Sequence, residues 1–248
     1  MTNPDQPNLG NTSTDIIVSL MKGGVGAIPV IGSMIAEVVG NVIPNQRVDR
    51  ISEFVRLLDE RLRLIKQSIL DAKFREPAVV DLLEDAFLQA ARATSHERLE
   101  YIANVVANGM SAEELEEAEA KRMLWLLGQL NDSEIIILRS RLVMTREDAN
   151  VDAEFRDRHT ELLTPDTTVM GSSQKEVEEA ALKASYRQHL HDLGLIRHRF
   201  QKPKRGELPE FDEKTGTIKA SGSDVTRLGK MFLRSLNLIP DWYSTKYE

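Results

Sequence analysis

Regular spacing of apolar residues constrains residues 46–73 more strongly than any other part of this chain. Apolar side chains recur there at alternating steps of three and four, which predicts a long amphipathic helix. The repeating positions are Val48, Ile51, Val55, Leu58, Leu62, Ile65 and Ile69, with Ala72 as the last. An unbroken helix over this range would be about 42 Å long at roughly 1.5 Å per residue. Its apolar stripe has to be covered, either by other helices of the chain or by further copies of it.

Two ways of covering this stripe stay open. Apolar residues farther along the chain, among them Leu82, Ile102 and Leu127, favour packing within one chain. We also expect a homo-oligomer in which the seven positions from Val48 to Ile69 form the contact. Several copies would be needed if a short apolar hairpin of the chain were to line a pore.

Further helical patterns follow between residues 77 and 143. They comprise a helix over 77–93 opened by Pro77, a helix capped by Thr94 and ended by Gly109, a helix capped by Ser111 and running to about residue 130, and a short helix capped by Asp132 or Ser133. Residues 45–143 are therefore predicted to form a helical domain. The fold class is mainly α: a helical bundle with one long heptad-patterned helix and a small α+β module at its C-terminal end.

The C-terminal module is predicted from a change of pattern after a linker at residues 144–173, which is charged and then rich in Thr, Pro, Gly and Ser. A short helix over residues 155–163 is an alternative within this linker. Within the module, residues 174–240, a helix stops at Gly194, strands are expected over 195–201 and 215–220, and a last helix begins at Ser223 or Asp224. This order resembles a winged helix. The resemblance is carried by HLHDLGLI at 189–196 and VTRLGKMFL at 225–233.

A basic run lies where the wing of such a module would be. It consists of Arg197, Arg199, Lys202, Lys204 and Arg205, with no acidic residue among them. A wing of this charge suits contact with phosphates. Acidic residues follow directly, however, and the preceding helix begins with Glu176, Glu178 and Glu179, which repel phosphate. A protein-docking or structural role is therefore favoured over DNA binding.

Residues 16–44 form an almost uncharged segment in which glycine and proline interrupt an apolar run. One interpretation is a membrane-active hairpin or amphipathic helix, with Gly23, Gly24, Gly26, Pro29, Gly32 and Gly40 permitting close approach and bending. The other is a helix buried on all sides in a bundle. The longest stretch without a charge, between Lys22 and Glu37, is shorter than the roughly 20 residues of a spanning helix. Residues 1–15 are read as a disordered lead.

Composition argues against an enzyme. The 248 residues include no cysteine, which excludes disulfides, thiol catalysis and cysteine-ligated metals. Neither a zinc-protease nor a serine-hydrolase motif occurs, and His189 and His191, two residues apart on a helix, point in different directions. We expect no catalytic residue, no metal and no cofactor. The net charge of −7 disfavours wholesale binding of nucleic acid.

Residues 45–238 are similar to bacterial abortive-infection proteins of the Abi-alpha type. The likeness is carried by FLQAARATSHERLEYIANVVANGM at 87–110 and MLWLLGQLNDSEIIIL at 123–138, which lead into the wing-like module. It implies phage defence by halting the infected cell, and it supplies no catalytic residue. We therefore expect a cytoplasmic effector that reaches the inner membrane through residues 16–44, contacts its lipid and responds to a protein trigger. The alternative is a soluble helical adaptor or regulator whose module binds a partner protein or DNA.

Overall fold

The computed structural model describes residues 47–63, 65, 67–111, 114–142, 149–164, 169, 171–203, 205–206, 208–212 and 216–239. The chain is mainly helical, with a small two-stranded antiparallel sheet near its C-terminal end, as predicted. It divides into two compact units. Unit 1 comprises Met1–Gln129 with Ser235–Asn237, and unit 2 comprises Leu130–Arg234 with Leu238–Glu248.

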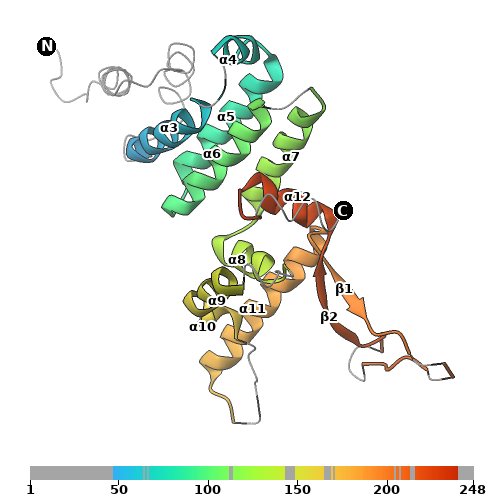
Figure 1. The fold of residues 1–248 in the computed structure, drawn as a ribbon. Coiled ribbons are helices and arrows are strands. Elements are labelled where there is room, and N and C mark those ends of the chain that lie inside the picture. The colour runs from blue at the N-terminus through green and yellow to red at the C-terminus, as the bar shows by residue number, and fades with distance from the viewer. Residues whose placement is uncertain are drawn as a thin grey trace, which may run out of the picture. The chain divides into compact units, whose positions relative to one another are not determined.

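Unit 1 is a helical bundle whose described helices are α3 (Val48–Leu62), α4 (Gln67–Lys73), α5 (Pro77–Arg92), α6 (His96–Ser111) and α7 (Glu114–Gln129). In this bundle α3, α5 and α7 pack against α6. Figure 1 shows α3, α5, α6 and α7 lying side by side. The core includes an edge-to-face pair of Phe54 and Phe87, with ring centroids 5.4 Å apart. Pro77 opens α5 at its first turn, as predicted.

The predicted unbroken helix over 46–73 is wrong, because the structure divides it into α3 and α4. The neighbouring α5 and α6 have 16 residues each and so extend about 24 Å. A straight helix of 42 Å would carry its last turns beyond their apolar faces. The division instead places Leu70 and Phe74 in the core, where both are buried.

Several predicted helix ends also differ from the structure. Ser95, not Thr94, caps α6, since its hydroxyl accepts from the Arg98 backbone N–H at 3.1 Å. The helix then continues past Gly109 to Ser111, so Gly109 is not its end. A Cβ on Gly109 would lie 2.4 Å from the Cβ of Ala120, which shows that this glycine permits the close approach of α6 and α7.

A polar network closes unit 1 around buried Asn104. Its amide nitrogen donates to the Leu236 carbonyl at 2.9 Å, and its oxygen accepts from the Arg61 guanidinium. Burial lowers the pKa of Arg61. Nearby, the Asn108 side chain donates to the Ser235 carbonyl at 3.1 Å. These bonds fasten residues 235–237 to α6 and account for their place in unit 1.

Unit 2 combines helices with a hairpin. Its elements are α8 (Asp132–Ser140), α9 (Ala149–Arg158), α10 (Thr160–Leu163), α11 (Gln174–Asp192), β1 (Ile196–Phe200), β2 (Ala220–Val225) and α12 (Arg227–Ser235). Asn131, rather than Asp132 or Ser133, caps α8 and forms a capping box with Glu134. The unit begins at Leu130, and α9 and α10 lie within the stretch predicted as a linker. Gly194 ends α11 with φ +71°, as its sequence position predicts.

The hairpin pairs β1 with β2 in antiparallel register, with Ile196 opposite Val225. The second strand was predicted over 215–220 but lies over Ala220–Val225; Ile218 forms only an isolated bridge to Phe211. Register is set at the base of the hairpin, where Ile196 is buried. Thr226 caps α12 through its hydroxyl, which accepts from the Gly229 N–H at 3.0 Å, so the last helix begins later than predicted.

Candidate functional site

The predicted membrane-active residues lie outside the described part of the chain. They are Gly23, Gly24, Gly26, Pro29, Gly32 and Gly40. Among the residues that the structure does describe, no helix combines the length and the apolar character needed to cross a bilayer. The membrane role of 16–44 therefore stays a prediction.

Most of the predicted oligomerisation stripe is buried in the bundle of a single chain. Ile51, Val55, Leu58 and Leu62 are 0–1% exposed, on the side of α3 that packs against α5 and α6. Ile65 is half-buried, Ile69 is 44% exposed, and the side chain of Val48 is outside the description. Packing within one chain thus accounts for the central stripe, whereas self-association stays a prediction.

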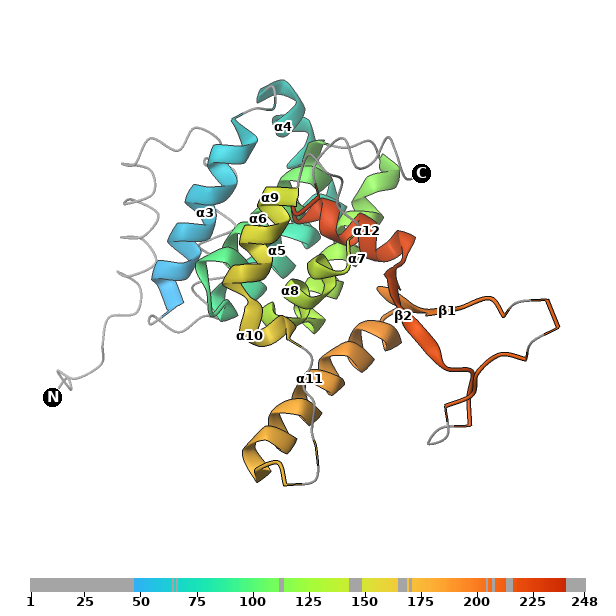
Figure 2. The ribbon, with the colours of Figure 1, turned by 60° about the horizontal axis from the view of Figure 1, so that its bottom comes forward.

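The basic run predicted for the wing lies on the exposed hairpin of unit 2. Arg197, Arg199, Lys202 and Arg205 are all exposed, and Lys204 is outside the described residues. Arg199 forms an ion pair with Asp224 of β2 at 3.2 Å. The outer part of the hairpin stands clear of α11 in Figure 2. This run is therefore available to a partner.

Apolar side chains share the hairpin with this basic run, which sequence reasoning did not predict. Leu208 is 88% exposed and Phe211 58% exposed, and Phe200 and Ile218 are exposed as well. The bridge between Phe211 and Ile218 continues the hairpin beyond the two strands. Exposed apolar groups on one projecting element are typical of a contact with another macromolecule.

A buried carboxylate ties two helices of unit 2 together. Glu134 of α8 is 3% exposed, and its Oε1 lies 2.6 Å from Nδ1 of His189 on α11. Its Oε2 accepts from the Asn131 backbone N–H at 2.8 Å. With both oxygens engaged, this carboxylate is a structural group that positions α11 against α8.

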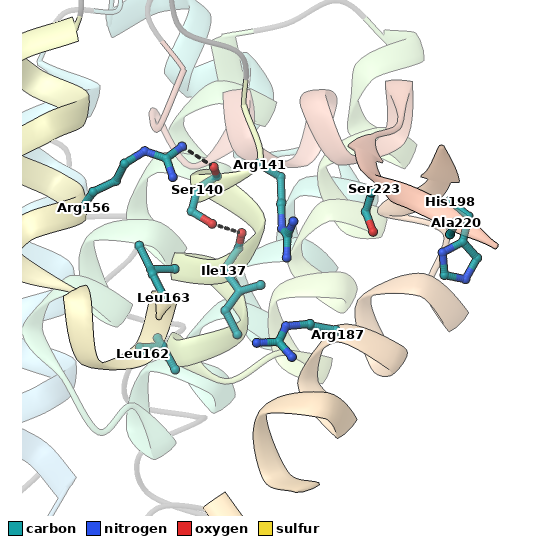
Figure 3. Close-up of a pocket in the computed structure, with 11 residues that line it drawn as sticks. Ile137, Ser140, Arg141, Arg156, Leu162, Leu163, Arg187, His198, Ala220 and Ser223 are labelled. Atoms are coloured by element: carbon teal, nitrogen blue, oxygen red, sulfur yellow. Dashed lines mark hydrogen bonds between the residues drawn. The ribbon is translucent and has the colours of Figure 1, made fainter. Parts of the chain in front are cut away.

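Unit 2 contains a pocket of about 520 Å³ that is lined by helices and by residues of both strands of the hairpin. Three arginines contribute to it: Arg141 follows α8, Arg156 is on α9 and Arg187 is on α11. Figure 3 shows the side chains of Arg141 and Arg187 reaching into the same space. The rest of the lining comprises Ile137, Ser140, Leu162, Leu163, His198, Ala220, Gly222 and Ser223.

The three arginines differ in how their charges are compensated. Arg156 donates to the Asp152 carboxylate at 2.6 Å and to the Ser140 carbonyl at 2.6 Å. Within the described residues, Arg141 and Arg187 form no ion pair and no acidic side chain lines the pocket. Burial lowers the pKa of Arg141, and the charges of Arg187 and Arg156 lower it further.

This pocket could not be predicted from the sequence, because its arginines are far apart in the chain and follow no motif. Among the described residues, no group of three or more His, Asp or Glu side chains could hold a metal ion. His191 has a tilted ring contact with His198, with centroids 4.2 Å apart, whereas His189 lies against Glu134. Comparisons with protein-family models, with curated proteins and with solved structures found no significant match.

Proposed function

We propose that this chain is a non-enzymatic anti-phage effector of the abortive-infection type. Residues 16–44 act on the inner membrane, copies of the chain associate, and the two folded units control when this occurs. A protein trigger is the expected signal. The proposal depends chiefly on one observation, the almost uncharged glycine-rich segment that immediately precedes the folded bundle.

The packing of unit 1 supports the proposal that residues 16–44 contact a membrane. The apolar side of α3 is engaged by α5 and α6, with Ile51, Leu58 and Leu62 completely buried. The opposite side carries Arg56, which binds Glu53 and Glu60 along the helix. This surface of α3 offers no apolar cover to the segment, and a bilayer is a medium in which an apolar segment is stable.

Membrane fractionation with a carbonate wash tests the proposal. Full-length protein is expected to stay with washed membranes and to release dye from loaded vesicles, whereas protein lacking residues 1–44 does neither. Val30→Asp places a charge within the apolar run and should abolish both effects, because a buried charge in a bilayer costs about 2.5 kcal/mol or more. Asn11→Asp adds the same charge in the preceding polar stretch and should change neither. The proposal would be refuted if loaded vesicles retained their dye in the presence of the full-length oligomer.

A second candidate function is supported by the exposed hairpin. In that case the chain is an adaptor whose module docks on a partner protein or on DNA. The apolar residues Phe200 and Phe211 beside the basic run favour a protein, since base-independent DNA contact requires mainly cations.

Titration of a labelled DNA duplex at two salt concentrations separates these partners. If DNA binds, the triple change Lys202→Glu, Lys204→Glu and Arg205→Glu should remove binding together with its salt dependence. Absence of duplex binding would exclude DNA and leave the protein-docking form, and duplex affinity unaffected by the triple change would exclude the basic run as a DNA site.

A further inference from the structure

The arginine pocket of unit 2 holds positive charge that the described fold does not neutralise. Arg141 and Arg187 have no acidic partner among the described residues, although both are partly buried. The two positive charges repel each other. This repulsion is one reason that the pKa of Arg141 is lowered. Two guanidiniums that line one pocket without an acidic partner can both donate charge-assisted hydrogen bonds to a bound anion.

The remaining lining fits a ligand with one anionic end. The Ser223 hydroxyl and the His198 ring lie on the hairpin side of the pocket, as Figure 3 shows, and can add hydrogen bonds to those of the guanidiniums. Ile137 of α8 with Leu162 and Leu163 of α10 form an apolar wall. The volume of about 520 Å³ falls within the range of small-molecule sites, roughly 300–1,000 Å³.

We propose that this pocket binds an organic phosphate, with its phosphate groups held by Arg141 and Arg187 and its less polar part against Ile137, Leu162 and Leu163. Guanidinium groups match phosphate oxygens with paired hydrogen bonds. Arg156 lines the pocket without binding the phosphate, because it already donates to Asp152 and to the Ser140 carbonyl. This site lies wholly in unit 2 and is independent of how residues 16–44 act.

Calorimetric titration of the full chain at constant ionic strength tests the site, with pyrophosphate as the anion alone and ADP as an organic phosphate. Both are expected to bind saturably, and ADP more tightly because its nucleoside contacts the apolar wall. Arg141→Gln and Arg187→Gln should each weaken binding by about 10-fold or more, since each removes charge-assisted hydrogen bonds. Arg92→Gln, on an exposed position of unit 1, is the control of equal charge and should bind as the unchanged protein does.

Thermal unfolding is a second measurement. In it the pocket variant should lose no stability without ligand, although it binds the ligand less tightly. Without ligand, Arg187→Gln should unfold at the same or a higher temperature, because it relieves repulsion with Arg141. With pyrophosphate at about ten times its dissociation constant, the unchanged protein should gain roughly 3 °C or more, and the variant should gain less. Lack of saturable binding, or pocket variants that bind as tightly as the unchanged protein does, would overturn the site. ADP binding no tighter than pyrophosphate would overturn the assignment to an organic phosphate.

Discussion

Single residues at the ends of the helices of unit 2 have structural roles in this chain. Glu134 completes the capping box of α8 and lies against His189, and Thr226 caps α12 while its hydroxyl donates to the Gly194 carbonyl at 2.7 Å. Gly229, in the same TRLG stretch, has no room for a side chain, because a Cβ would lie 2.3 Å from the Leu195 carbonyl oxygen. These groups therefore hold the ends of α8, α11 and α12 in place.

Gly109→Ala should destabilise unit 1 by about 1–3 kcal/mol, because the new methyl group would overlap Ala120 at the crossing of α6 and α7. Gly128→Ala is the matched control. There the nearest atoms belong to the flexible end of Gln89 at 3.2 Å, and stability should be unchanged or slightly raised. Urea unfolding followed by circular dichroism measures both. The double change Gly109→Ala and Ala120→Gly should recover most of the loss; a double variant as unstable as the single one would contradict the overlap.

At the scale of elements, the sequence predicts those features that local chemistry determines. Pro77 and Gly194 are such cases, because a ring-locked φ and a positive φ leave few alternatives at the two ends of a helix. The order of helices, hairpin and last helix follows from the same reasoning. These signals suffice for the fold class and for the exposure of the basic run.

Features that depend on tertiary packing could not be predicted in this way. Thr94 and Ser95 both suit a helix cap, and only the observed bond to Arg98 distinguishes them. Gly109 fits a helix end as well as it fits a helix crossing, since both uses need a missing Cβ. The pocket is the extreme case: Arg141 and Arg187 are brought together only by the packing of α8 on α11.

At the scale of the whole molecule, the two units differ in the structural features that they contain. Unit 1 follows the apolar segment directly and has a core of helix against helix, whereas unit 2 has the arginine pocket and the exposed hairpin. In the proposed function, unit 1 carries the membrane-active residues and unit 2 receives the signal. Two compact cores also predict that heat unfolds the protein in more than one calorimetric transition.

Acidification should lower the unfolding temperature of unit 2, because His159 takes up a proton more readily in the unfolded chain. Burial lowers the pKa of this residue below its usual 6.5, and the charges of Arg158 and Arg139 lower it further. In the unfolded chain the ring titrates at about 6.5, so below that pH the unfolded state binds more protons and stability falls until the folded pKa is passed. His159→Gln removes this titrating group and should reduce the loss of stability between pH 7.5 and pH 5. Scanning calorimetry of both proteins measures it, and equal pH dependence of the two would show that His159 does not couple folding to protons.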